Sequence, residues 1–130
     1  MGSEGAAFSK SRGEDERVSD CLFCKIVSKE IDAEILHESS EVLAFQDINP
    51  AAPTHVLVIP KRHIGSALDL GPDDGDLLVD LFETMTSMAK TAGLDNGHRL
   101  VTNVGSDGGQ TVDHLRFHVL GGRSLSWPPG

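Results

Sequence analysis

The chain has 130 residues, of which 38% are apolar, and its formal net charge is −9. This length is typical of one domain with one hydrophobic core. The acidic balance argues against broad nucleic-acid binding, which needs a basic face, although local donors can still bind a small phosphate ligand. No segment approaches the roughly 20 continuous apolar residues that span a bilayer, and the N-terminus lacks the pattern of a secretory signal. We therefore expect a cytoplasmic protein without membrane contact, whose two cysteines are thiols or metal ligands rather than a disulfide.

Two parts of the chain differ in composition. Residues 1–19 are small, polar and charged, which is typical of a disordered tail. Residues 20–130 carry the apolar patterns of a single domain. The first element expected there is a short helix from Cys21 to about Ser28, capped by Asp20.

Short strands are predicted after this helix. The apolar and β-branched runs that predict them are Glu34–His37, Val42–Gln46 and His55–Ile59. The serine pair at 39–40 predicts a hairpin turn between the first two strands, and the prolines at 50 and 53 indicate a loop before the third.

The second half of the chain predicts one long helix and two further strands. Asp73–Ala92 is the expected helix, because its leucines and methionines recur with the helical period. The expected strands are Arg99–Val104 and Val112–Leu120, with a glycine-rich loop at 105–109 between them. About five strands and one long helix, without regular βαβ alternation, indicate an α+β protein with an antiparallel sheet.

Three basic residues alternate with apolar ones in the last expected strand. Alternate side chains share one face of a strand, so His114, Arg116 and His118 should point the same way. A lone strand histidine is usually structural, but two histidines around an arginine after a glycine-rich loop indicate a phosphate site. Arginine and protonated histidine both donate to phosphate oxygens. The loop could add backbone N–H donors, although by itself it fits a solvated hairpin equally well.

Several collinear segments from Cys21 to Gly130 resemble the Hint branch of the histidine triad (HIT) superfamily. They are residues 43–50, 52–61, 103–110 and 118–123, together with the final Trp127-Pro128-Pro129-Gly130. The resemblance implies the HIT fold, in which an antiparallel sheet of about five strands carries one long and one short helix, and it implies a homodimer. It also implies a purine nucleoside monophosphate ligand, AMP or GMP, and hydrolysis of a phosphoramidate or related nucleotidyl bond through a nucleotidylated histidine.

The resemblance further implies roles for individual residues. His114 occupies the first histidine position and supports the second, while His118 occupies the third and contacts phosphate. Asp47 holds the ribose, and the base lies in an apolar slot of Ile31, Phe45 and Ile48, with His55 nearby. Contacts to phosphate and leaving group fall on Asn103, Gly109, Gln110 and Thr111. Trp127 reaches toward the site of the partner in the homodimer.

The second motif position departs from the family pattern, because it is Arg116 instead of the nucleophilic histidine. A neutral imidazole can attack phosphorus and later leave, whereas a guanidinium stays protonated and has no usable lone pair. Removing a nucleophile commonly costs roughly 10⁴–10⁶ in rate, which is about 5–8 kcal/mol of barrier. We therefore predict an inactive or strongly impaired hydrolase, whether Arg116 is an engineered replacement or a natural variant. Phosphate binding is retained unless the larger side chain fills the pocket.

Cys21 and Cys24 are three residues apart, so on a helical turn both sulfurs face one side. One such pair supplies two of the four ligands of a tetrahedral zinc. A redox pair normally needs a thioredoxin-like βαβ setting, which is not predicted here. The resemblance to bacterial relatives implies that His63 and His114 complete a structural zinc site. The alternative is two buried thiols and an exposed His63.

Three functions are compatible with these patterns. The chain is a purine nucleoside phosphoramidase or nucleotidyl hydrolase, active or impaired; a module that binds nucleotide without turnover; or an interaction scaffold with a vestigial pocket. Arg116 favours the second over the first. The presence of Asp47, Asn103 and His118 argues against the third.

Overall fold

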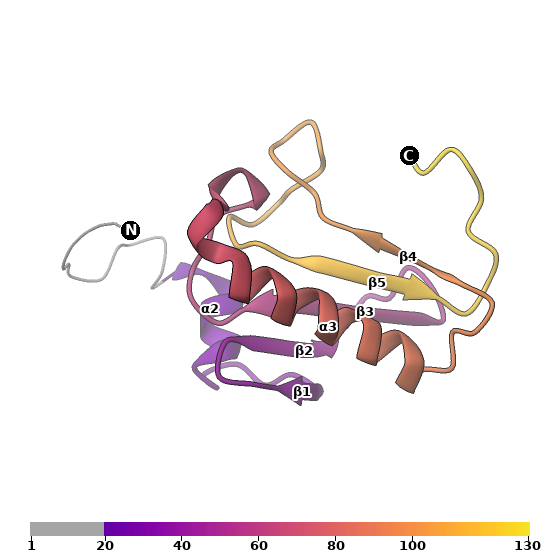
Figure 1. Ribbon diagram of the computed structural model, residues 1–130, viewed down its shortest axis with the longest axis horizontal. Coiled ribbons are helices and arrows are strands. Elements are labelled where there is room, and N and C mark those ends of the chain that lie inside the picture. The colour runs from indigo at the N-terminus through magenta and orange to yellow at the C-terminus, as the bar shows by residue number, and fades with distance from the viewer. Residues whose placement is uncertain (1–19) are drawn as a thin grey trace, which may run out of the picture.

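A five-stranded antiparallel sheet forms the centre of the computed structural model, which describes residues 20–130 (Figure 1). The expected tail at 1–19 lies outside the described residues. The strands are β1 (Ile35–Glu38), β2 (Val42–Gln46), β3 (Thr54–Pro60), β4 (His98–Val101) and β5 (Phe117–Gly121). Their order across the sheet is β1-β2-β3-β5-β4, and every neighbouring pair is antiparallel. The predicted α+β class is confirmed.

The two helices pack on the sheet through separate apolar clusters. Helix α3 (Gly75–Thr91) lies across one face, where its buried leucines and methionines contact valines of β2, β3 and β5 (Figure 1). Helix α2 (Leu22–Val27) contributes Phe23 and Ile26 to a second cluster with the alternate residues of β2 and β3. Because successive strand residues point to opposite faces, β2 contributes Ala44 to the first cluster and Phe45 to the second.

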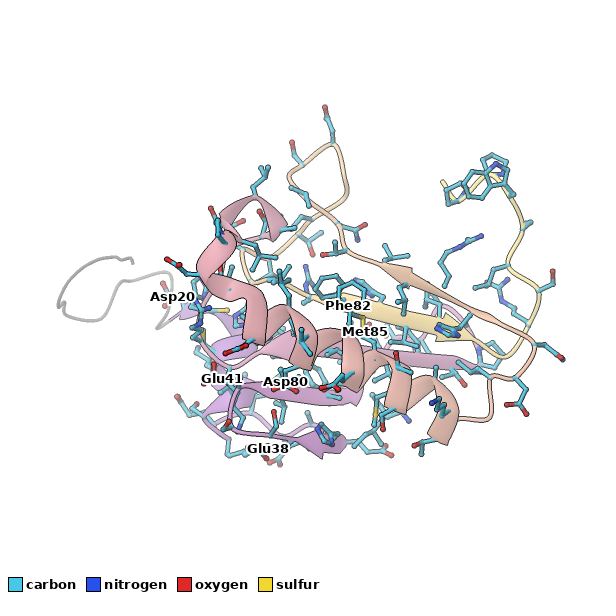
Figure 2. All side chains as sticks on the ribbon, viewed as in Figure 1. Asp20, Glu38, Glu41, Asp80, Phe82 and Met85 are labelled. Atoms are coloured by element: carbon cyan, nitrogen blue, oxygen red, sulfur yellow. The ribbon has the colours of Figure 1, made fainter. Side chains whose placement is uncertain are left out.

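Two contacts on the α3 side show how the long helix is fixed. Phe82 meets the ring of Phe117 in β5 edge-on, with centroids 5.8 Å apart (Figure 2). The turn between β1 and β2 forms where it was predicted, and the Ser39 hydroxyl donates to Asp80 of α3 at 3.1 Å (Figure 2). Among residues 20–130, no helix is long and apolar enough to cross a membrane.

The last strand is shorter than expected, since β5 begins at Phe117 and not at Val112. In the register of β3 and β5, Phe117 lies opposite Val58. Further pairing would reach Pro60, which ends β3 and has no N–H to donate. The chain before β5 follows a different course, and the N–H of Leu115 donates to the carbonyl of Ile64 at 2.6 Å.

Other predicted boundaries also differ from the structure, by one to three residues. Strand β4 ends at Val101 rather than Val104, and beyond it the hydroxyl of Thr102 donates to the backbone carbonyl of Arg116 at 2.7 Å. Helix α2 is capped by Cys21 and not by Asp20, because the Cys21 sulfur accepts the N–H of Cys24 at 3.4 Å. The long helix begins at Gly75, after the short 3₁₀ turns η2 (Ala67–Asp69) and η3 (Pro72–Asp74).

Candidate functional site

The basic residues of the predicted motif lie on the sheet face that carries α2. In the sheet register, His118 is opposite Leu57, a member of the α2 cluster. The Arg116 guanidinium lies 4.7 Å from the ring centroid of Phe23 in α2. The His114 ring also lies beside Phe23, with centroids 6.0 Å apart. The three side chains therefore share one face, although His114 precedes the strand.

Arg116 is a half-buried cation that no anion of the described chain neutralises directly. Within residues 20–130, its guanidinium makes no hydrogen bond and no ion pair. Burial lowers the pKa of Arg116, while the charges of Asp47 and Cys21 oppose that shift. A guanidinium nevertheless stays protonated in proteins. The face of Phe23 stabilises it through a cation–π contact, and its N–H donors stay available to an anion.

Asp47, His55 and His118 lie together on the same face of the sheet, further along β3 and β5 from Arg116. The N–H of Ala51 donates to Nδ1 of His55 at 3.0 Å, so the proton of neutral His55 is on Nε2. That nitrogen lies 2.9 Å from Nδ1 of His118 and 3.4 Å from the Asp47 carboxylate. His55 Nε2–H therefore donates to His118 Nδ1, and neutral His118 carries its own proton on Nε2.

Burial keeps both imidazoles neutral near pH 7. It lowers the pKa of His55, and the nearby charge of Asp47 only partly opposes this. It also lowers the pKa of His118, and the neighbouring His55 and Arg116 act in the same direction. The tautomers that the hydrogen bonds assign are thus those of the neutral rings.

The glycine-rich loop at residues 105–109 is held in a defined shape by close packing and by hydrogen bonds. A Cβ on Gly108 would lie 2.4 Å from the carbonyl oxygen of Val104, so a larger residue cannot fit without a backbone shift. The side chain of Gln110 holds the loop: it accepts from the N–H of Gly105 and donates to the carbonyls of Gly65 and Val112. The Gln110 amide is therefore engaged within the protein.

The remaining predicted ligand residues differ widely in exposure. Phe45 is 3% exposed and packs beside Phe23, with ring centroids 6.2 Å apart. Ile31 is 37% exposed, whereas Ile48 and Trp127 are 87% and 81% exposed. Asn103 is half-buried, and Gly109 and Thr111 lie on the surface of the loop. The structure thus joins Asp47, His55 and His118 by direct contacts and leaves the outer part of the expected base slot open.

Phe23 is a site residue that the sequence reasoning missed. Its apolar character and helical position predicted only a core residue, and it is indeed 5% exposed. The available signal was its position between Cys21 and Cys24, two candidate metal ligands. The contact with Arg116 depends on the packing of α2 against the sheet and could not be derived from spacing.

Four potential metal ligands converge at the start of α2. They are Cys21, Cys24, His63 and His114, whose ligand atoms all lie within 4.8 Å of one another. Nδ1 of His114 is 3.3 Å and 3.6 Å from the two sulfurs, and Nδ1 of His63 is 3.2 Å from Cys24 Sγ. Ligands of a tetrahedral zinc are separated by about 3.5 Å.

The outer contacts of this cluster also suit a metal. Nε2 of His114 lies 3.0 Å from the carbonyl oxygen of Pro60, to which it donates, so the Nδ1 lone pair faces the sulfurs. Burial lowers the pKa of His114 to about 4, which keeps the ring neutral. A second group, Asp47, His55 and His118, has similar spacing. In that group Nε2 of His55 carries a proton that it donates to Nδ1 of His118, so neither nitrogen offers a lone pair to a metal.

Comparison with known proteins agrees with this architecture. The family model described as the scavenger mRNA decapping enzyme C-terminal binding domain matches residues 20–126. A HIT-like protein of Synechococcus elongatus is 49% identical over 111 residues, which cover 85% of this chain and 97% of that protein. A HIT family hydrolase of Legionella pneumophila has a TM-score of 0.84 and 49% identity, over 85% of this chain and all (100%) of that one. A histidine triad nucleotide-binding protein of Candida albicans has a TM-score of 0.72 and 34% identity, over 84% of this chain and 83% of that one. With this fold, these relatives and the matching segments along the domain, the chain belongs to the histidine triad superfamily.

Proposed function

We propose that this chain binds a purine nucleoside monophosphate. We further propose that its hydrolysis of phosphoramidate or related nucleotidyl bonds is absent or strongly impaired. The observation that carries the proposal is the half-buried Arg116 cation, whose guanidinium makes no ion pair within residues 20–130 and which lies two residues from the His118 N–H donor. A phosphate would supply the acceptors that both groups lack. In this arrangement Asp47 holds the ribose. Asn103, Gly109, Gln110 and Thr111 contribute the loop side of the phosphate site, Gln110 by holding the loop.

The base is expected over the apolar surface of Ile31, Phe45 and Ile48. Phe45 forms the floor of this slot, since it is 3% exposed, while Ile48 is 87% exposed and free to close over a ligand. Two relatives support the proposal, because one is named as a nucleotide-binding protein and another as a hydrolase.

Hydrolysis should be impaired because neither side chain facing the phosphate offers a lone pair. Arg116 is protonated throughout the useful pH range. The Nδ1 lone pair of His118 accepts from His55 at 2.9 Å, and its Nε2 carries the proton. His118 is therefore a hydrogen-bond donor in the ground state and does not replace the missing nucleophile. A direct attack by water would have to proceed without covalent catalysis.

The test is hydrolysis of adenosine 5′-phosphoramidate by the natural chain and by Arg116→His. We expect the variant to gain roughly 10⁴-fold in rate or more, the amount that a nucleophile commonly contributes. Equal turnover by both proteins would show that Arg116 does not disable the site. An inert variant that still binds AMP would refute the hydrolase part of the proposal and favour the non-catalytic module.

We further propose that Cys21, Cys24, His63 and His114 hold a structural zinc ion. The donor set and the 3.2–3.6 Å spacing of its atoms support this assignment. When bound, the metal would link α2 to the segment before β5 and would stabilise the fold. Metal analysis of freshly purified protein tests the assignment, and a substoichiometric zinc content would refute it.

The expected homodimer has a suitable surface on α3 and β4. Val79 and Phe82 are 59% and 49% exposed on the outer side of the helix, and Leu100 is 39% exposed on the edge strand β4. Pairing of two copies would cover this apolar area and the open strand edge. Sedimentation should give the mass of a dimer for the natural chain and of a monomer for Phe82→Glu. A monomeric natural chain would refute the proposal.

A further inference from the structure

We infer that the phosphate site selects a terminal phosphate with two negative charges, as in a nucleoside 5′-monophosphate, over singly charged phosphoramidates, diesters and sulfates. This inference rests on the proposed nucleotide-binding function and specifies its ligand. It also assigns the site to the product of the family reaction rather than to its substrate.

The first step of the argument is the chemistry of the donors. Arg116 offers N–H groups in a planar fork that can contact two phosphate oxygens at once. His118 offers one N–H, because its other nitrogen accepts from His55 at 2.9 Å. Three acceptor oxygens on one phosphorus are present in a phosphate monoester. A diester has only two such oxygens. In a phosphoramidate the third position is an amino group, whose hydrogens would point at the N–H donors of Arg116 and His118 and could not accept from them.

The second step is charge. Arg116 has no ion pair within the described chain, so its charge is not neutralised by direct contact. The Asp47 carboxylate acts on Arg116 only through space, because its oxygens accept from the N–H of Asn49 at 2.8 Å and lie 3.4 Å from His55 Nε2. Both histidines are neutral. A second negative charge on the phosphate is therefore stabilised mainly by the Arg116 guanidinium.

The third step is rigidity, because selectivity needs a cation that cannot move away. The Phe23 ring lies 4.7 Å below the guanidinium and is itself 5% exposed. The Arg116 backbone is tied as well, since its carbonyl accepts from the Thr102 hydroxyl at 2.7 Å. A fixed donor distinguishes ligands by charge and shape more sharply than a solvated, flexible one.

A ligand series at one pH separates charge from shape. We would measure dissociation constants by calorimetry near pH 7.5, above the second phosphate pKa of about 6. The ligands are AMP, adenosine 5′-sulfate, AMP methyl ester and adenosine. The sulfate has the three terminal oxygens of AMP but one charge less. We expect the natural chain to bind AMP about tenfold or more tightly than the sulfate, as for a charge-assisted hydrogen bond.

Two variants locate the source of this preference. Arg116→Gln should reduce the ratio of the AMP and sulfate constants to about threefold or less and leave adenosine binding unchanged, which also reports on correct folding. Lys90→Gln is the control, because it removes an exposed cation from α3, which packs on the opposite face of the sheet. This control should keep the full ratio.

The outcomes distinguish failure of the charge selectivity from failure of the proposed nucleotide binding. Equal binding of AMP and the sulfate by the natural chain, or an unchanged ratio in Arg116→Gln, would overturn the inference. If AMP bound no better than adenosine, the proposed function itself would fail.

Discussion

Phe23→Leu should weaken phosphate binding through Arg116, although Phe23 itself lies in the core. The guanidinium is 4.7 Å from the ring centroid and half-buried, a geometry for which cation–π contacts contribute about 0.5–2 kcal/mol. Loss of that contact lets the cation move, so AMP affinity should fall roughly 2- to 30-fold. Adenosine affinity should change much less.

The same substitution also affects stability. Phe23 packs against Phe45 and His114, with centroids 6.2 Å and 6.0 Å apart. Loss of these ring contacts should lower the free energy of unfolding by about 1–3 kcal/mol. Stability and phosphate affinity must therefore be measured separately, by urea unfolding and by calorimetry.

Phe117→Leu provides the matched control. Phe117 directly follows Arg116, but its side chain is 8% exposed, points to the opposite, α3 face of the sheet and contacts Phe82. Both variants should lose comparable stability, and only Phe23→Leu should change the ratio of AMP to adenosine affinity. Combining Phe23→Leu with Arg116→Gln should add little to the second change alone. A similar loss of ratio in Phe117→Leu, or full additivity in the double variant, would refute the positioning argument.

Three further predictions concern the metal ligands, pH and the loop. Cys24→Ala should abolish bound zinc in metal analysis and lower Tm by several degrees, whereas a normal zinc content would contradict the four-ligand site. In the metal-free protein, the pKa of His114 is about 4 when folded and 6.5 when unfolded. The unfolded chain therefore takes up the proton first, and the free energy of unfolding should fall by about 2 kcal/mol between pH 7 and pH 5. Urea unfolding at the two pH values measures this, and a smaller loss in His114→Gln identifies the residue. Gly108→Ala should cost about 1–3 kcal/mol, because its Cβ would lie 2.4 Å from the Val104 carbonyl oxygen. Gly75→Ala has nothing within 4 Å and should be neutral or stabilising in the same assay.

The sequence by itself determined the class of the fold and most of its elements. Short β-branched runs and one long segment of helical period sufficed, because the periodicity of apolar residues follows directly from which faces are buried. β2 was predicted to the residue, and the other strands and α3 existed where expected. The boundaries depended on partners. β5 begins at Phe117 because β3, far away in the chain, ends at Pro60.

The sequence also determined which chemistry residue 116 can perform, since a guanidinium has no lone pair in any fold. Only the tertiary structure decided what surrounds it. The cation–π contact with Phe23 joins residues that are distant in the chain, and the proton on His118 Nε2 follows from a relay through His55 and the N–H of Ala51. Such contacts depend on how helices and strands pack, which local patterns do not encode. The sequence shows the arginine, but only the structure shows that Phe23 holds its guanidinium in place and that His118 is a hydrogen-bond donor.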